Sequence, residues 1–358
     1  MYKCRFYTII AISLIVMTFC DACISISYSV PDKTPSSAES QDWTANGQSW
    51  PDGQETGLIP VDGGEVLYHY YGKDKPGIPI IFLHGGPGAD GTCFFKQTAL
   101  AETHPIVIYN QLGSVGSPFS DDISTAEEAQ SLLTIEHFVN EVQTVVDYFG
   151  FEEFVICGRS WGTMLAVEYV AAKQPEGLKG IVLDGPFLNV DRWCEDAERL
   201  IKSLDNGEEY WQIVKECEKS GDFDSPEYTK VNKIYSDNFY SRVEGANDGT
   251  PVDPPASHII PDLSVYKYMW GPSEFSCMGT LKGHDSTTLL SHIDVPILYI
   301  CGQYDSGTPE AANWYLSMTN DGELCVLPGC GHNASRERPV EFNAVVGAFA
   351  DRVSQKTN

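Results

Sequence analysis

Short apolar runs alternate with amphipathic ones along most of this chain, and the alternation predicts its fold. The apolar runs before residue 188 are EVLYHYY, IPIIFLHGG, PIVIYN, EFVICG and KGIVLDG. Residues 134–150 instead repeat apolar side chains at the spacing of one buried helical face: Ile135, Phe138, Val139, Val142, Val145, Val146 and Phe149. Short apolar strands separated by helices pair in parallel through right-handed crossovers. We therefore predict an α/β fold with a mostly parallel sheet and helices on both faces.

The alternation stops between about residues 188 and 290, where aromatic, acidic and proline residues mix, as in RWCEDAERL and GEEYWQIVKECEKSGDF. This composition predicts a mostly helical insertion. The alternation resumes with VPILYICG, PEAANWYLSM, ELCVLPG and PVEFNAVVGAFADRV. We therefore divide the folded chain into a first core segment (55–187), a helical cap (188–290) and a second core segment (291–358).

The N-terminal part does not follow this pattern. Residues 1–23 begin with two basic side chains and continue in a mostly apolar run that Asp21 ends, which is typical of a secretory signal. A lipid on Cys20 or Cys23, or an uncleaved anchor, is the alternative. Residues 24–54 are rich in Ser, Pro, Asp and Gln and are expected to form a polar tether. We expect an exported protein (secreted, periplasmic or lipid-anchored) that meets a membrane only through this leader.

The charge balance excludes one class of partner. The 358 residues carry 23 Lys and Arg against 50 Asp and Glu, a formal net charge of −27. Such a surface repels phosphate backbones and anionic membranes, so nucleic-acid binding is not expected.

Eight of the eleven cysteines lie after the leader, from Cys93 to Cys330, and an even number permits disulfides in an exported protein. The pairs to test first are Cys194 with Cys217 and Cys325 with Cys330. No second closely spaced Cys or His pair accompanies the last of these, so we expect no zinc site and no other metal or cofactor.

The residues that follow the apolar runs carry the candidate chemistry, because ligands bind at the carboxyl ends of strands in an open α/β sheet. Ser160 lies in a Gly-Arg-Ser-Trp-Gly turn between a strand and a helix, where it either caps the helix or is the nucleophile of an elbow. Asp305 and His332 follow later strands, and the order Ser, Asp, His is that of an α/β-hydrolase triad. A serine hydroxyl needs an imidazole to take its proton, and that imidazole needs a carboxylate. We therefore predict Ser160 as nucleophile, His332 as base and Asp305 as the orienting acid.

The glycine-rich sequence HGGPG (84–88) follows another strand. Glycines allow a backbone N–H to point at a developing oxyanion, and the residue after the nucleophile supplies a second donor. We predict these two donors to be Gly86 and Trp161.

Seven motifs together resemble one family. HGGPG, NQLGSVGS, GRSWGTMLAVEY, MWGPSEF, TLKGHDST, GQYDSGTPE and GCGH follow in the order found in the prolyl aminopeptidases (proline iminopeptidases), across about residues 60 to 352. The resemblance implies an α/β-hydrolase fold with a helical cap, and hydrolysis of the amide bond after an unblocked N-terminal residue, often proline. It also implies the same triad, and Glu274 as the receptor for the free amine of a small peptide or aminoacyl amide.

Three positions depart from the family pattern. Ser306 stands where many members carry a second amine-binding glutamate, Asn110 replaces the usual aspartate before Gln111, and Arg159 replaces a frequent histidine before the nucleophile. Fewer carboxylates should hold an ammonium less strongly. An amino-acid amidase or esterase is therefore the alternative function, and a catalytically silent binding protein is a second alternative.

Overall fold

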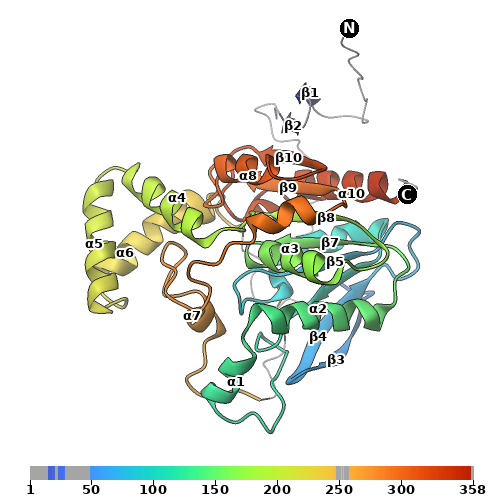
Figure 1. Ribbon diagram of the computed structural model, residues 1–358, viewed down its shortest axis with the longest axis horizontal. Helices are drawn as coiled ribbons and strands as arrows, with labels where there is room; N and C mark the ends of the chain where they lie inside the picture. The colour runs from blue at the N-terminus through green and yellow to red at the C-terminus, as the bar shows by residue number, and fades with distance from the viewer. Residues whose placement is uncertain are drawn as a thin grey trace.

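The fold is built around one sheet, shown in Figure 1. The computed structural model describes residues 15–20, 23–28, 49–246, 251, 253 and 258–355. In this part of the chain the sheet has ten strands in the order β1-β2-β10-β9-β8-β7-β5-β6-β4-β3. Their bounds are β1 Ile15–Cys20, β2 Cys23–Tyr28, β3 Glu55–Val61, β4 Gly64–Tyr71, β5 Ile80–Leu83, β6 Ile106–Tyr109, β7 Phe154–Arg159, β8 Leu178–Asp184, β9 Ile297–Gly302 and β10 Gly322–Leu327.

The neighbouring strands from β2 through β10, β9, β8, β7 and β5 to β6 pair in parallel, whereas β1, β3 and β4 pair antiparallel to their neighbours. The prediction of a mostly parallel sheet is confirmed. The chain winds outward in opposite directions from β5, which lies between β6 and β7. Such a switch point opens a crevice at the carboxyl ends of the strands, and the loop after β5 is HGGPG.

Alternate strand residues face two apolar layers, as the twofold repeat of a strand requires. Ile81 and Leu83 pack toward α2 (Ile135–Phe149), α3 (Trp161–Lys173) and α8 (Pro309–Leu316). Ile80 and Phe82 pack toward the 3-10 helix η1 (Gly91–Glu102) and α10 (Pro339–Ser354). The prediction of helices on both faces is confirmed.

The sequence of α2 explains its bounds. The Thr134 side chain accepts a hydrogen bond from the His137 N–H at the first turn, and Gly150 ends the helix with φ 60°. The core of the predicted apolar stripe is buried: Phe138, Val139, Val142, Val145 and Val146.

The chain between β8 and β9 forms further helices, the first of which Figure 1 shows beside the sheet, whereas the last contacts α3. These helices are α4 (Val190–Lys202), α5 (Gly207–Ser220), α6 (Pro226–Tyr235), the π-helical turn η2 (Ser236–Tyr240), α7 (Val265–Met269) and η3 (Thr287–His292). Helices α4, α5 and α6 share an apolar core of their own, which includes Ile201, Trp211, Tyr228 and Tyr235. The remaining helices are α1 (Ala126–Leu132) and α9 (Ala334–Glu337).

The N-terminal predictions lie mostly outside the described residues. Within the expected leader (1–23) and tether (24–54), β1 and β2 pair with each other and β2 pairs with β10. At the end of the expected tether, Trp50 is 5% exposed and stacks on His69, so this end of the segment is packed rather than loose. None of the described helices has the length and apolar character needed to span a bilayer.

Candidate active site

Ser160 lies in a sharp turn between β7 and α3. Its backbone has φ 53° and ψ −120°, a conformation that L-residues rarely adopt. The turn requires glycine on both sides, since a Cβ on Gly158 would lie 2.1 Å from the Gly162 carbonyl oxygen. The Ser160 side chain makes no cap hydrogen bond to α3 and is partly exposed. The interpretation of Ser160 as a helix cap is therefore wrong, and the strained turn has the shape of a nucleophile elbow.

His332 and Asp305 form a buried pair. His332 Nδ1 lies 2.7 Å from Asp305 Oδ1, and the two residues are 0% and 1% exposed. Asp305 also accepts hydrogen bonds from the backbone N–H groups of Gly302 at 3.1 Å and Gly307 at 2.7 Å. Because a carboxylate accepts, the His332 proton sits on Nδ1 and the lone pair on Nε2. Nε2 has no hydrogen-bond partner among the described residues and is available to take a proton.

The end of β8 brings Ser160 and His332 to the same place. The Ser160 N–H donates to the Asp184 carbonyl oxygen at 2.8 Å. The next residue, Gly185, lies against the imidazole, since a Cβ there would be 2.5 Å from His332 Cε1. Ser160 and His332 therefore flank one turn, and Asp305 joins them through His332.

The HGGPG loop lies against the nucleophile. A Cβ on Gly85 would be 3.1 Å from Ser160 Cβ, so a larger residue there would crowd the serine. Gly86, the next residue, has φ 113°, a conformation that favours glycine. Trp161 is the first residue of α3, and its N–H lies at the positive end of that helix. Trp161 therefore follows Ser160 along the chain, and Gly86 follows the glycine that contacts the Ser160 side chain, while their role as oxyanion donors stays a prediction.

Two side chains hold this loop in place, and neither was predicted to have this role. The Gln111 side chain accepts from Trp161 Nε1 at 2.9 Å and donates to the His84 carbonyl oxygen at 3.0 Å. His84 Nδ1 donates to the Gly85 carbonyl oxygen at 2.8 Å, and Nε2 accepts from the Gln111 N–H at 2.9 Å. Burial lowers the pKa of His84, which keeps the ring neutral in this arrangement.

Glu274 lies in the cap and connects to the base through an aromatic side chain. Its Oε1 accepts a hydrogen bond from the Tyr266 hydroxyl at 2.9 Å. Its carbonyl oxygen accepts from Trp193 Nε1 at 2.7 Å, and the Trp193 ring lies 5.3 Å from the His332 ring. Glu274 is partly exposed, so its carboxylate can meet a ligand.

Comparison with known proteins identifies the family. Residues 78–339 match the family described as alpha/beta hydrolase fold. A proline iminopeptidase of Heyndrickxia coagulans is 33% identical over 297 residues, which are 83% of this chain and 99% of that protein. This chain belongs to the proline iminopeptidase family of alpha/beta hydrolases. The resemblance inferred from the motifs and the predicted fold are confirmed.

Solved structures agree with this family. The crystal structure of proline iminopeptidase from Mycobacterium smegmatis has a TM-score of 0.70 and 25% identity, and the match covers 84% of this chain and 98% of that one. The crystal structure of VinJ has a TM-score of 0.71 and 25% identity, and the match covers 84% of this chain and 99% of that one.

Arg159, the first departure from the proline iminopeptidase pattern, links the nucleophile turn to the loop of the base. Its Nη2 donates to Asn333 Oδ1 and, at 3.4 Å, to the His332 carbonyl oxygen. Its Nε lies 3.6 Å from Asp184 Oδ2. Burial raises the pKa of Asp184 to about 6, and the Arg159 charge opposes this rise. Asn333 is 2% exposed, so this contact is buried.

The second departure, Asn110, is matched by a carboxylate from the cap. Asn110 Nδ2 donates to Asp253 Oδ2 at 2.8 Å. Asp253 also accepts from Trp50 Nε1 at 2.5 Å and from His69 Nε2 at 2.9 Å. Burial raises the pKa of Asp253, but the hydrogen bonds from His69 and Asn110 outweigh it and hold the pKa below its usual value. An aspartate at position 110 would place two carboxylates against each other, whereas the amide of Asn110 can donate a hydrogen bond to Asp253.

The third departure, Ser306, places a buried hydroxyl directly after Asp305 of the triad. The Ser306 hydroxyl is 1% exposed and has no hydrogen-bond partner among the described residues. The Tyr235 hydroxyl lies near it without a well-formed hydrogen bond between them. Burial raises the Tyr235 pKa, and the negative charges of Glu274 and Asp305 raise it further. Glu274 therefore faces the region that a glutamate at position 306 would also face.

Aromatic residues of the cap pack in two groups. Trp193 and Trp270 pack around Phe187, with ring centroids 5.1 and 5.2 Å from it, next to His332. Phe275 instead packs with Tyr228 and Tyr235 inside the core of the cap.

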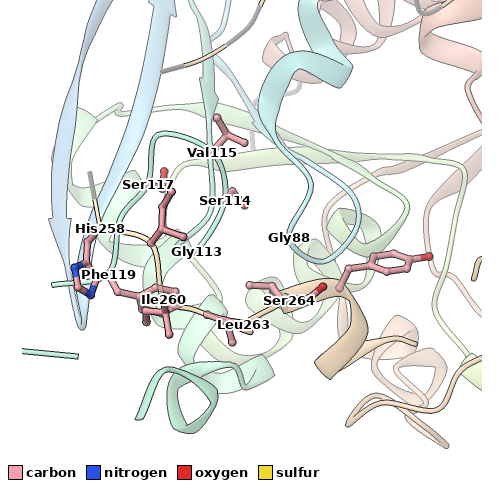
Figure 2. A pocket seen from close by; sticks show the side chains of 13 residues that line it. Gly88, Gly113, Ser114, Val115, Ser117, Phe119, His258, Ile260, Leu263 and Ser264 are labelled. Carbon is pink, nitrogen blue, oxygen red and sulfur yellow. The ribbon is translucent and has the colours of Figure 1, made fainter. Parts of the chain in front are cut away.

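A cavity of about 340 Å³ lies beside the HGGPG loop and is drawn in Figure 2. Gly88, Ser114, Ile260, Leu263 and Tyr266 are among the residues that line it. Tyr266 connects this cavity to Glu274 through its hydroxyl. No cluster of His, Cys, Asp or Glu in the described part of the chain is arranged to hold a metal ion.

Proposed function

We propose that this chain is a serine aminopeptidase that releases an unblocked N-terminal residue, proline or another small or apolar residue, from a small peptide or aminoacyl amide. The His332–Asp305 pair is the observation that carries the proposal. It is fully buried and leaves the Nε2 lone pair unpaired among the described residues, and the turn after β8 contacts both the His332 ring and the strained Ser160 turn. Membership of the proline iminopeptidase family supports the same reaction class.

The proposed reaction proceeds through an acyl-enzyme. His332 Nε2 takes the Ser160 proton while Oγ attacks the carbonyl carbon, and Asp305 stabilises the imidazolium that forms. The N–H groups of Gly86 and Trp161 receive the oxyanion, and each such donor contributes about 3 kcal/mol to transition-state stabilisation. The imidazolium then gives its proton to the leaving amine. Water, deprotonated by Nε2, attacks the ester and releases the free amino acid.

Glu274 is the proposed receptor for the substrate ammonium. Its carboxylate is held by the Tyr266 hydroxyl, and its main chain is fixed by Trp193, which also contacts the His332 ring. A cation that enters a partly dry site needs such acceptors to replace its water. Because Trp193 contacts both, the amine receptor and the base have a fixed relative position.

The test compares chromogenic aminoacyl substrates with a free amine against the same substrates with an acylated amine. The proposal predicts that kcat/KM for the free prolyl or alanyl substrate exceeds that of its N-acyl counterpart by at least about tenfold, since one ion pair separates them. Equal rates would contradict amine recognition, and the absence of turnover on every substrate would contradict the hydrolase function.

An amino-acid amidase or esterase is the second candidate, and Ser306 is the observation that favours it. With Glu274 as the amine-binding carboxylate that remains, the site holds less negative charge than in family members with a glutamate at that position. The two functions differ in their leaving groups. Faster hydrolysis of a prolyl amide or ester than of a prolyl peptide, at equal concentration, would favour the amidase or esterase function over the aminopeptidase function.

We also propose that the protein is exported. The basic start and apolar run of residues 1–23 support this. Sequencing the N-terminus of the mature protein from a cell fraction outside the cytoplasm tests it, and an intact Met1 in the cytoplasmic fraction alone would contradict it.

A further inference from the structure

Two cysteines of the cap lie next to the segment that carries Glu274. Cys194 follows Trp193 in α4, and Cys277 lies three residues after Glu274. The hydrogen bond from Trp193 Nε1 to the Glu274 carbonyl oxygen brings these two segments into direct contact. The Cys194 sulfur faces the backbone N–H of Cys277, and both residues line one cavity of about 700 Å³.

We propose that Cys194 and Cys277 form a disulfide site, oxidised by a small disulfide such as oxidised glutathione, and that the bond ties α4 to the turn that carries Glu274. The eight cysteines from Cys93 to Cys330 are all free thiols in the structure. The pairing of Cys194 with Cys217 is less suitable. The Cys217 sulfur lies 3.4 Å from Ser225 Oγ, inside the separate core of the cap helices.

The exposure of the two thiols sets the order of the steps. Cys194 is partly exposed, whereas Cys277 is 8% exposed. The Cys194 thiolate attacks oxidised glutathione, which gives a mixed disulfide and one molecule of glutathione. The Cys277 thiolate then attacks the Cys194 sulfur and releases the second glutathione. The two electrons lost by the protein thiols reduce the glutathione disulfide, and the two protons end on the glutathione thiols.

The surroundings of the thiols make this reaction slow at neutral pH. Burial raises the pKa of Cys277 to about 12 and also raises the pKa of Cys194. The charged groups that face the pair are Asp191 and Glu218, which favour the thiol, and Lys282, which favours the thiolate. Because the thiolate is the nucleophile, oxidation speeds up as pH rises. A bond that forms once and persists fits this behaviour better than a rapid switch.

The bond should stabilise the cap without disturbing the site. It closes a long loop, from residue 194 to residue 277, and long loops gain most from a crosslink in the chain-entropy account. Since the Trp193–Glu274 hydrogen bond already exists without this disulfide, we expect turnover to change by less than about twofold. We expect the Tm to rise by about 5 °C or more, the shift that corresponds to a typical disulfide in a domain of this size.

The experiment uses the full chain, reduced and then incubated with oxidised glutathione at mildly alkaline pH. Free thiols are then alkylated, and the protein is digested for peptide mapping by mass spectrometry. The proposal predicts a linked peptide pair that contains Cys194 and Cys277, with an intact mass lower by two hydrogens. Cys277→Ser should instead keep one glutathione on Cys194, and Cys194→Ser should stay reduced at Cys277. Cys217→Ser is the matched control from the same cap, and it should form the link as the wild type does.

Two results would overturn the proposal. Alkylation of both thiols after oxidation shows that no bond forms, and a link from Cys194 to another cysteine shows that the pairing is wrong. A linked protein whose Tm equals that of the reduced form contradicts the stabilising role. These outcomes are independent of the peptidase activity, because none of them is measured through turnover.

Discussion

At the scale of single residues, the protonation of the site follows from its partners. Two backbone N–H groups and His332 Nδ1 donate hydrogen bonds to Asp305, which fixes the imidazole tautomer. Asp184 lies nearby with neither carboxylate oxygen hydrogen-bonded among the described residues. Its main charged partner is Arg159, whose Nε lies 3.6 Å from Oδ2, and Ser335 and His332 favour its charge to a smaller extent. Asp305 therefore accepts three hydrogen bonds, whereas neither oxygen of Asp184 has a well-formed hydrogen bond among the described residues.

Glu274→Gln tests amine recognition, because it removes the charge and keeps the shape. We expect a loss of roughly 2–4 kcal/mol in transition-state binding for free-amine substrates, the range for breaking a partly buried ion pair. N-acylated substrates, which carry no cation, should lose far less. The measurement is kcat/KM on both substrate classes. Glu195→Gln, an exposed glutamate of the same cap, is the matched control and should change neither. Equal losses on both classes would show that Glu274 only supports the cap.

Asp184→Asn tests how much stability the burial of the Asp184 charge costs. Its pKa in the folded protein is raised to about 6, so its contribution to stability is present below the unfolded pKa and is lost as pH rises from about 4 to about 6. The variant does not titrate there. We expect the two proteins to differ little near pH 4, and the variant to be more stable by about 3 kcal/mol above pH 6, since each pKa unit is worth about 1.4 kcal/mol. Urea unfolding of both proteins across this range provides the comparison, and a constant difference would refute the assignment.

At the scale of elements, loops rather than helices position the reacting groups. The turn after β8 contacts both Ser160 and His332, and Gln111 and His84 hold the loop after β5 against the Trp161 side chain. Asn110, at the end of β6, reaches the cap through Asp253. The carboxyl ends of β5, β6, β7 and β8 therefore act as one rigid frame for the site.

A charge exchange between Asn110 and Asp253 tests the contact between β6 and the cap. Asn110→Asp should lower the free energy of unfolding by about 1–3 kcal/mol, because two buried carboxylates would then face each other. Adding Asp253→Asn to that variant should recover at least half of the loss, since an amide again meets a carboxylate. Denaturant midpoints of the single and double variants decide the matter. A double variant that is less stable than Asn110→Asp would show that the two residues do not interact.

At the scale of the whole molecule, the sequence predicted the sheet well and the contacts of the cap poorly, and the triad assignment stays a prediction. The apolar runs are local signals, and the triad residues follow strands, where a sheet of this type binds ligands. The contacts of Asp253 with Trp50 and Asn110 join residues 203 and 143 positions apart, and no local pattern indicates such pairs. The same limit applies to Phe275, which packs inside the cap, and to Trp193, which meets His332, although both are aromatic residues of one segment.

Asp184 shows why the candidate site was incomplete. It follows a strand in KGIVLDG just as the other site residues follow theirs, so the same signal was present. Its role depends on Arg159, which faces it from the adjacent strand β7. Arg159 and Asp184 lie side by side because β7 and β8 are neighbours in the sheet. The apolar pattern predicts which segments are strands, but it does not predict the order of the strands in the sheet.

The central claim is that Ser160 is the nucleophile of an enzyme that reads a free amine, and one labelling measurement tests both parts. A prolyl diphenyl phosphonate with a free amine is incubated with the wild type, and the modified peptide is located by mass spectrometry. We predict a single adduct on Ser160, no adduct on Ser160→Ala, whose Tm should stay close to that of the wild type, and slower labelling by the N-acylated phosphonate. An adduct on another residue, or equal rates for the free and acylated reagents, would contradict the account.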